Sequence, residues 1–298
     1  MGPFLLRQIT LISNASAGGG RAGRRARDLA NRLVSRELSV DHHPTNSADE
    51  ARQVVSDAVA SSCECLCVAG GDGTIRNVLD LVASTDTPLA VLPSGRGNDF
   101  VRAIGGPSSV DRVAQAIQCM AIRRVDLGAV NGSLFATVAG CGLDAEVGRL
   151  TEGGSAFGST AGYLVQAIRS ISSFSGYVIR VEVDGRVVWD GDTTLVACAN
   201  TSTYGGGFMI APGADPTDGL LDVCVIKRVS RIKALSLLPQ LAVGEHTGHP
   251  DVTFYQGESV RITSEELLHA VADGDVVGQI PLQITTRASV LDVITECS

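Results

Sequence analysis

Gly70-Gly71-Asp72-Gly73-Thr74 lies between an apolar segment, residues 65–69, and a segment with helical spacing. Apolar residues then recur at i, i+3, i+4 and i+7, which predicts one amphipathic helix carrying Ile75, Val78, Leu79 and Val82. Glycines at such a turn let backbone N–H groups approach an anion, and the helix N-terminus adds partial positive charge. A carboxylate there repels phosphate unless a divalent cation lies between them. The stretch therefore predicts a phosphate site at which Asp72 contacts a cation, directly or through water.

Strand and helix patterns alternate over the first ~125 residues. The segments that read as strands are residues 5–12, 38–41, 65–69 and 89–92. Helical spacing covers residues 21–36 and 48–61, and a further helix opens at residues 98–104. Strands that alternate with helices form a mainly parallel sheet with helices on both faces. We therefore predict an α/β domain over residues 1–125.

The pattern changes after Val125. Asn131-Gly132 and Asp184-Gly185 are strong hairpin-turn signals within residues 128–142 and 177–190. Further strands are predicted at 194–199, 221–226, 260–263, 270–272 and 280–286, with helical spacing at 158–173 and 232–243. We predict an antiparallel β-sandwich over residues 126–286. It is left open whether the tail, residues 287–298, packs back on the first domain.

The composition argues against several classes of function. The net charge is −8 and aromatic residues make up 4% of the chain, which disfavours nucleic-acid binding and strong attraction to anionic membranes. No segment of about 18 apolar residues predicts a membrane span, and the N-terminal sequence lacks the features of a secretory signal. The eight cysteines, several within apolar segments, are typical of a reducing cytosol. We predict a cytoplasmic protein and leave open a peripheral, transient contact with the membrane surface.

Two local clusters have a structural and a functional interpretation. Cys63-x-Cys65-x-Cys67 would suggest a metal site, but period-two spacing on a strand without nearby partners favours core packing. A predicted helix carries five arginines, which form either a solvated face or a contact to phosphate or a lipid headgroup: Arg21, Arg24, Arg25, Arg27 and Arg32.

Two further glycine-rich turns follow predicted strands. Gly18-x-Gly20-x-x-Gly23, with Asp41 downstream, matches a dinucleotide fingerprint, but a nucleotide-phosphate turn over residues 14–18 is the favoured interpretation. The second turn, residues 93–100, contains Asn98 and Asp99, either of which could simply cap the next helix. Because the carboxyl ends of parallel strands face one crevice, we expect Asp72 and Asp99 to face one nucleotide–metal site.

The two turns together, Gly70-Gly71-Asp72-Gly73-Thr74 and Gly95-Arg96-Gly97-Asn98-Asp99-Phe100-Val101-Arg102, resemble the diacylglycerol kinase catalytic-domain family. That family includes bacterial lipid kinases, sphingosine kinases and ceramide kinases. Further segments follow in family order: Val125-Asp126-Leu127-Gly128, Gly205-Gly206-Gly207, Ala211-Pro212, Asp218-Gly219-Leu220-Leu221-Asp222 and Asp273-Gly274-Asp275.

The resemblance implies an NAD-kinase-like first domain, a β-sandwich second domain and ATP bound between them. It assigns ATP contacts to Asn14, Ser16, Gly18, Thr45, Gly70, Gly71, Asp72, Gly73, Thr74, Arg96 and Asn98. A water–Mg²⁺ network is implied at Asp72, Asp99 and Asp126, and a second, structural Mg²⁺ at Asp215, Asp218 and the Leu220 carbonyl. Asp273 is implied as the general base, and Asp275 is the neighbouring catalytic candidate.

Four positions depart from the family pattern. Arg76-Asn77 stands where the family has Asn-Glu or His-Glu, Arg96 replaces a common threonine, and Asp275 replaces a glutamate. The leading hypothesis is a MgATP-dependent kinase that converts diacylglycerol to phosphatidic acid. The alternatives are a kinase of the same family acting on a soluble or natural-product hydroxyl compound, and a non-catalytic ATP-binding relative. The resemblance also allows a homodimer.

Overall fold

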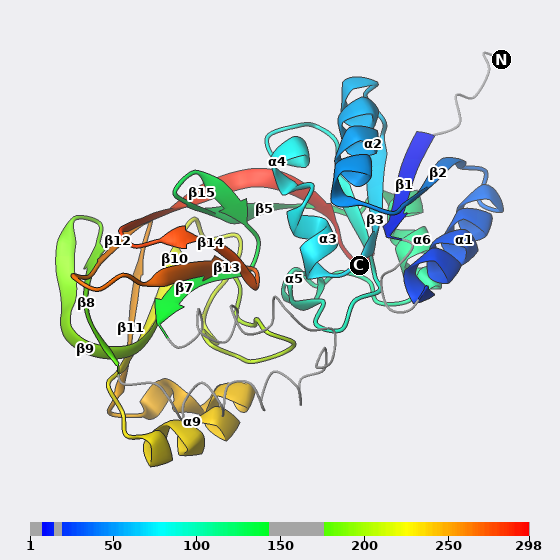
Figure 1. Ribbon diagram of the computed structural model, residues 1–298. Coiled ribbons are helices and arrows are strands. Elements are labelled where there is room, and N and C mark those ends of the chain that lie inside the picture. Colours follow the sequence, from blue (N-terminus) through cyan, green and yellow to red (C-terminus); the bar gives the residue numbers. More distant parts are fainter. Residues whose placement is uncertain (1–7, 15–19, 143–175, 298) are drawn as a thin grey trace. The chain divides into compact units, whose positions relative to one another are not determined.

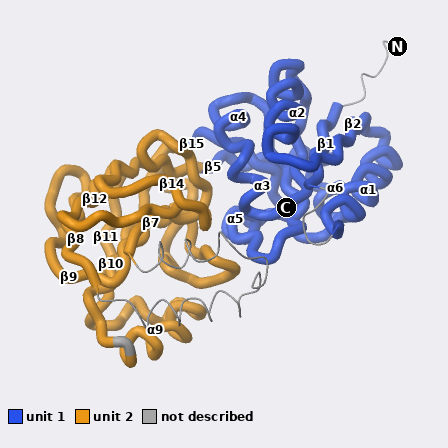
Figure 2. Tube along the Cα trace, viewed as in Figure 1, with its two compact units in different colours: residues 1–125, 289–298 blue, residues 126–288 orange. Residues whose placement is uncertain are grey.

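The computed structural model describes residues 8–14, 20–142 and 176–297, and the predicted helix at 158–173 and the residues Ser16 and Gly18 lie outside these ranges. The chain divides into two compact units (Figure 2). Unit 1 contains residues 1–125 and 289–298, and unit 2 contains residues 126–288. Each unit is built around its own strands and its own core.

Unit 1 contains the predicted parallel sheet, with strand order β4-β3-β1-β2. The end of the last strand of the chain, β15, pairs in parallel with β4 at Val293. The strands are β1 (Gln8–Asn14), β2 (Ser39–Thr45), β3 (Cys65–Gly70), β4 (Leu89–Pro93) and β15 (Leu282–Ile294). All six residues of β3 are buried, as expected for a strand covered by helices on both faces.

Helices connect these strands (Figure 1). They are α1 (Arg21–Val34), α2 (Ala48–Ala60), α3 (Asp72–Arg76), α4 (Leu79–Val82), α5 (Asp99–Ala103) and α6 (Val110–Cys119). Helix α1 packs against α6, and α2 packs against α4. The chain steps from β1 outward to β2 and then back to β3, so right-handed crossovers place α1 and α2 on opposite faces. Leu29 and Leu33 of α1 join alternate residues of the strands, such as Ile9 and Cys67, in one core.

The predicted single helix over residues 75–82 is wrong, because two short helices stand there. All four apolar side chains of the pattern are buried as expected. In a continuous helix the Asn77 carbonyl would accept a bond from Leu81, but the Leu81 amide donates to Val78 instead. The Arg52 guanidinium from α2 donates to the Asn77 carbonyl at 2.6 Å and also pairs with Asp80. Arg52 therefore binds the carbonyl oxygen that would accept the next hydrogen bond of a continuous helix.

Unit 2 is largely antiparallel. Its strands are β5 (Ile122–Val130), which begins in unit 1, β6 (Ser133–Phe135), β7 (Val138–Gly142), β8 (Tyr177–Val183), β9 (Arg186–Ala199), β10 (Leu221–Lys227), β11 (Val252–Gly257), β12 (Ser259–Thr263), β13 (His269–Ala272), β14 (Asp275–Gln279) and the first part of β15. The hairpins predicted at Asn131-Gly132 and Asp184-Gly185 are confirmed as the β5–β6 and β8–β9 turns. Strands β11 and β14 and, in unit 1, helix α6 were not among the predicted elements.

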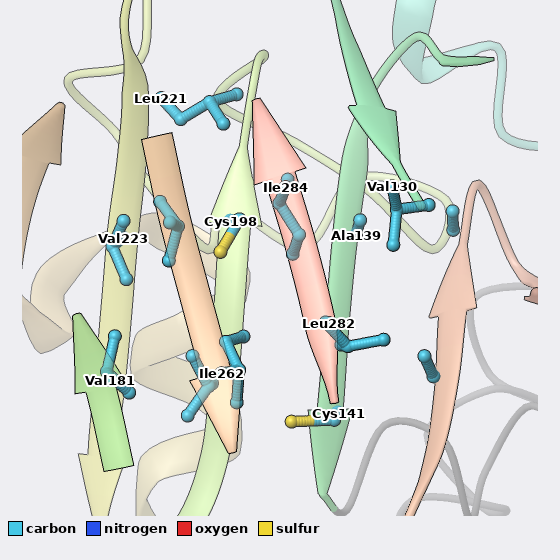
Figure 3. Packing of buried hydrophobic residues seen from close by; sticks show 14 of the residues in the cluster. Val130, Ala139, Cys141, Val181, Cys198, Leu221, Val223, Ile262, Leu282 and Ile284 are labelled. Carbon is cyan, nitrogen blue, oxygen red and sulfur yellow. The ribbon is translucent and has the colours of Figure 1, made fainter. Parts of the chain in front are cut away.

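Apolar side chains from the strands of unit 2 form its core (Figure 3). Val181, Cys198, Val223, Ile262 and Ile284 are each fully buried and come from five different strands. The predicted helix near residues 232–243 is confirmed as α9 (Arg231–Val243), with a 3₁₀ turn η1 (Glu245–Gly248) after it. The unit therefore has the hydrophobic core expected of a β-sandwich domain.

Candidate active site

Two glycine-rich turns of unit 1 touch through their backbones. A Cβ atom built on Gly95 would lie 2.6 Å from the Cα of Gly71, and one built on Gly71 would lie 2.9 Å from the Cα of Gly95. The Ser94 amide donates to the Gly70 carbonyl at 2.8 Å, which extends the β3–β4 pairing into the turns. Only glycine permits this approach at positions 71 and 95. The two turns that the sequence singled out are thus one structural feature.

Asn98 gives the second turn its shape. Its side chain accepts a hydrogen bond from the Gly95 amide and donates one to the Gly95 carbonyl, each at 3.1 Å. Its φ of 52° is left-handed, a conformation that asparagine tolerates better than most residues. Helix α5 then begins at Asp99. The side chain of Asn98 therefore brackets the turn rather than capping α5, since it accepts no bond from that helix.

The carboxylates of Asp72 and Asp99 belong to these two turns. Asp72 Oδ1 accepts a hydrogen bond from the Phe100 amide at 3.3 Å, so it reaches the start of α5. Asp99 is buried and forms an ion pair of 2.7 Å with Arg102, whose guanidinium also donates to the Gly97 carbonyl. The structure thus brings the Asp72 side chain to the residue that follows Asp99. Acidic groups gather at the carboxyl ends of two neighbouring parallel strands, where α/β sheets bind ligands.

The other predicted nucleotide residues of unit 1 lie on or beside the same strands. Asn14 ends β1, and Thr45 ends β2 with its hydroxyl donating to the Ser13 carbonyl at 3.4 Å. The two strands are in register there, because Asn14 pairs with Thr45. Arg96 has an exposed side chain in the second turn. Gly73 and Thr74 lie in α3, and Thr74 crowds Gly70, at which a Cβ would come within 2.5 Å of it.

One arginine of the basic helix α1 has a structural role. Arg25 donates through its two terminal guanidinium nitrogens to backbone carbonyls, those of Pro93 and Ser108. Pro93 is the last residue of β4, just before the second glycine turn. Burial lowers the pKa of Arg25 from its usual value, and the charge of Arg21 adds to this effect. Arg25 therefore stabilises the end of β4, just before the second glycine turn.

In unit 2, Asp126 is buried and binds the loop before β10. Its Oδ2 accepts a hydrogen bond from the Gly219 amide at 2.7 Å, and its own amide donates to the Pro216 carbonyl at the same distance. Asn200, at the end of β9, donates through Nδ2 to the Asp126 carbonyl at 3.0 Å. The predicted metal-network residue thus anchors the segment that carries Asp215, Asp218 and Leu220.

That segment folds as consecutive turns around its carboxylates. Asp215 Oδ1 accepts bonds from the amide and hydroxyl of Thr217, and Asp218 Oδ1 accepts one from the Leu220 amide. The pKa of Asp222 is raised, first by burial and then by the negative charge of Asp218. In residues 8–14, 20–142 and 176–297, no group of three or more His, Cys, Asp or Glu side chains is placed to hold a metal ion. Any cation here would therefore depend on the Leu220 carbonyl as well as on two carboxylates.

Asp273 occupies the turn of the β13–β14 hairpin, beside β7 (Figure 1). Its φ is 50° and that of Gly274 is 89°, which is typical of a tight Asp-Gly hairpin turn. Its Oδ1 accepts bonds from the amide of Thr137 at 2.8 Å and from the hydroxyl of Thr137 at 2.6 Å, and its Oδ2 accepts one from the Ala136 amide at 2.8 Å. Asp275, two residues on, is exposed. Asp273 is therefore both the turn residue of a hairpin and a carboxylate that hydrogen bonds hold in one orientation.

Thr137 and Asn200 lie in none of the sequence motifs. Both are buried, and both contact residues that the motifs had selected. Neither lies in a glycine-rich turn or beside a second acidic residue, and their side-chain partners are 64 to 136 positions away along the chain. No local pattern marks them.

Family descriptions match both units. Residues 8–130 match the diacylglycerol kinase catalytic domain, and residues 137–295 match the YegS C-terminal NAD kinase beta sandwich-like domain. A protein of Mycobacterium tuberculosis (strain CDC 1551 / Oshkosh) named diacylglycerol kinase is 31% identical over 293 residues. These residues cover 96% of this chain and 94% of that protein.

Solved structures share the fold. A diacylglycerol kinase from Bacillus anthracis str. Sterne has a TM-score of 0.77 at 22% identity and is matched over 98% of both chains. An NAD kinase from Archaeoglobus fulgidus in complex with ATP has a TM-score of 0.55 at 13% identity, over 97% of this chain and 94% of the other. The predicted fold class, an NAD-kinase-like α/β domain followed by an antiparallel β-sandwich, is confirmed. Within the part of the chain that the structure describes, no helix is long and apolar enough to span a bilayer.

Sequence motifs, both family descriptions and a relative aligned along nearly the whole chain agree. The chain belongs to the diacylglycerol kinase catalytic-domain family.

Proposed function

We propose that this protein is an ATP- and Mg²⁺-dependent kinase that transfers the γ-phosphoryl group to a lipid hydroxyl, with diacylglycerol as the acceptor. The single observation that carries the proposal is the backbone contact between the Gly71 and Gly95 turns, each of which brings a carboxylate to the end of its strand. Family membership and the names of the relatives support the kinase class. Under the proposal, the glycine turns bind the phosphates of ATP.

The donor atoms fit magnesium. In unit 1, Asp72 and Asp99 would hold Mg²⁺ through water at the phosphates, and in unit 2, Asp215, Asp218 and the Leu220 carbonyl would hold a second ion. Mg²⁺ prefers hard oxygen ligands, and each of these groups supplies one. Burial is the larger cause of the raised pKa of Asp222 and the negative charge of Asp218 the second, and a bound cation would relieve this second, repulsive effect. When bound, Mg²⁺ would neutralise charge on the transferring phosphoryl group.

The residues of the chain perform the remaining steps. The amides of Gly71, Asp72 and Gly73 orient the phosphates, because N–H groups at a strand-to-helix turn point toward an anion, whereas the Thr74 amide donates to the Gly71 carbonyl. Asp273 accepts the proton of the acceptor hydroxyl as its oxygen attacks the phosphorus, and the bond from phosphorus to the β–γ bridging oxygen breaks. Phosphoryl transfer depends mainly on such positioning and on charge neutralisation.

The test is phosphorylation by the full chain with radiolabelled ATP and MgCl₂, using diacylglycerol in mixed vesicles and, separately, a panel of soluble polyols. We expect labelled phosphatidic acid, and we expect Asp273→Asn to lower kcat by at least about a hundredfold. Phosphorylation of a polyol alone would support the alternative acceptor class. ATP binding without transfer to any acceptor would leave a non-catalytic relative and refute the proposal.

Asp184→Asn is a matched control. Asp184 also occupies an Asp-Gly hairpin turn of unit 2, with a φ of 49°, and its carboxylate also accepts two backbone amides, those of Glu258 and Ser259. The control therefore reproduces the structural effect of replacing such an aspartate. If both variants lost activity equally, Asp273 would have no special chemical role.

A further inference from the structure

The carboxylate of Asp273 is held by more donors than its turn requires. Asp184, in the equivalent turn of the β8–β9 hairpin, accepts two amide bonds at one oxygen. Asp273 accepts amides at both oxygens and, in addition, the hydroxyl of Thr137 at 2.6 Å, the shortest of these three bonds. Bonds donated to a carboxylate are charge-assisted and stronger than neutral ones. The Thr137 hydroxyl is therefore a tight constraint on the rotation of this side chain.

The peptide that donates to Asp273 is itself held by Asn200. The Asn200 Nδ2 group donates to the Ala136 carbonyl at 2.9 Å and to the Asp126 carbonyl at 3.0 Å. The Asn200 amide also donates to the Thr137 carbonyl at 2.8 Å. One side chain thus ties the donors of Asp273 to the backbone of Asp126.

Asn200 makes these bonds at an energetic disadvantage. It is 1% exposed, and its Oδ1 atom has no hydrogen-bond partner in the described structure. A buried acceptor without a partner destabilises the folded state, so its presence calls for an explanation beyond stability. The two donor bonds of Nδ2, which need an amide at this position, provide that explanation.

We propose that Thr137 and Asn200 are positioning residues that fix the Asp273 carboxylate in the orientation needed to receive the acceptor proton. This inference rests on the proposed function, because it presumes that Asp273 is the base. A general base must hold an oxygen within hydrogen-bond reach of the proton that it takes. Thr137 acts directly on that orientation, and Asn200 acts through the 136–137 peptide.

Thr137→Val is the principal test, because it removes the hydroxyl and keeps the volume and both amide donors. A hydrogen bond to a charged group is worth about ten- to a hundredfold in an equilibrium, so we expect kcat to fall by about that factor. The KM for ATP stays within about twofold, because the glycine turns are untouched, and the acidic limb of the pH–rate profile moves to higher pH. Thr137→Ser restores the hydroxyl and recovers kcat to within about threefold of wild type.

Thr194→Val is the matched control. Thr194 is 5% exposed against 4% for Thr137, and its hydroxyl also makes a partly buried hydrogen bond, to the Lys227 carbonyl at 3.0 Å. It contacts none of the proposed catalytic groups, so we expect kcat to change by less than about twofold. Asn200→Ala should reproduce the kcat loss of Thr137→Val. If it does not fold, Thr137→Val and Thr137→Ser still decide the question.

A second measurement separates this inference from the proposed function. In pH titrations of the full chain by NMR, the amide protons of Ala136 and Thr137 should shift together with one midpoint, and Asp273→Asn should abolish that shift. Thr137→Val should move the midpoint to higher pH. These results would support positioning even if no acceptor were phosphorylated, an outcome that refutes only the proposed function. Equal kcat in wild type and Thr137→Val, or amide shifts that survive Asp273→Asn, would overturn the inference.

Discussion

Gly95→Ala should separate the two glycine turns of unit 1. The new Cβ would lie 2.6 Å from the Cα of Gly71, whereas ordinary contact begins at 3.4 Å. The turns must therefore move apart by about 0.8 Å, the difference between these distances, and the atom in the way is backbone that cannot rotate aside. Overpacking of this kind costs about 1–3 kcal/mol. We expect the free energy of unfolding to fall by that amount.

Gly73→Ala is the control for stability, and only for stability, because Gly73 belongs to the proposed phosphate site. A Cβ on Gly73 meets no atom within 4 Å, and its residue lies inside α3. Alanine is favoured over glycine in a helix by up to about 1 kcal/mol, so this variant should be as stable as wild type or more stable. Urea denaturation of the full chain, followed by circular dichroism, compares the two variants under the same conditions.

Gly95→Ala should also differ from the wild-type chain in nucleotide binding if the turns act as one site. The Asn98 side chain makes two hydrogen bonds to the backbone of Gly95, and a displaced turn would lose them. Gly95→Ala should therefore weaken ATP binding, which calorimetry measures. A Gly95→Ala protein that unfolds at the same urea concentration as Gly73→Ala would show that the turns do not make the contact seen here. The steric argument for their glycines would then fail.

Three further predictions concern charge and thiols. Arg52 lowers the pKa of Asp80 mainly by hydrogen bonding, so Asp80→Asn should lower the free energy of unfolding by about 0.2–1 kcal/mol at pH 7. This cost should vanish as the pH falls below 3.8 and through the lowered pKa of Asp80. Urea unfolding at pH 7 and at a pH below the lowered pKa measures the difference. Asp222→Asn should raise the unfolding midpoint at pH 7, because the raised pKa means that the folded state disfavours the ionised acid, and the gain should shrink as pH falls through that pKa toward 3.8. A thiol reagent followed by peptide mass spectrometry should modify Cys119 and Cys297 in the native chain and leave the six buried cysteines unmodified, most of which also have pKa values raised by burial.

The fold could be predicted from the sequence wherever a pattern is local. Alternating apolar residues and turn dipeptides located the β5–β6 and β8–β9 hairpins, and helical spacing located α1, α2 and α9. The prediction of a single helix after Gly73 was wrong because of a tertiary contact. Arg52 lies 25 residues from Asn77, and its bond to the Asn77 carbonyl divides the helix although every apolar position is buried as the period requires.

The candidate site shows the same limit. The glycine turns can be recognised in the sequence, because the close backbone approach requires glycine at Gly71 and Gly95. Thr137 and Asn200 leave none, since a buried threonine or asparagine is ordinary in any strand-rich domain. Their importance follows from the atoms that they contact, which are brought near only when β7, β9 and β13 assemble.

The two Asp-Gly hairpins of unit 2 show why a motif alone does not identify a base. Asp184 and Asp273 share the dipeptide, a φ near 50° and a carboxylate that accepts backbone amides. The carboxylates differ in one further donor, the Thr137 hydroxyl, and in whether the donating peptide is itself tied to a buried aspartate through Asn200. If orientation rather than the turn makes a base, removing the threonine beside Asp273 would destroy most of the activity although the Asp-Gly turn itself is unchanged. The chemistry proposed for this chain therefore depends on the neighbours of Asp273 as much as on Asp273 itself.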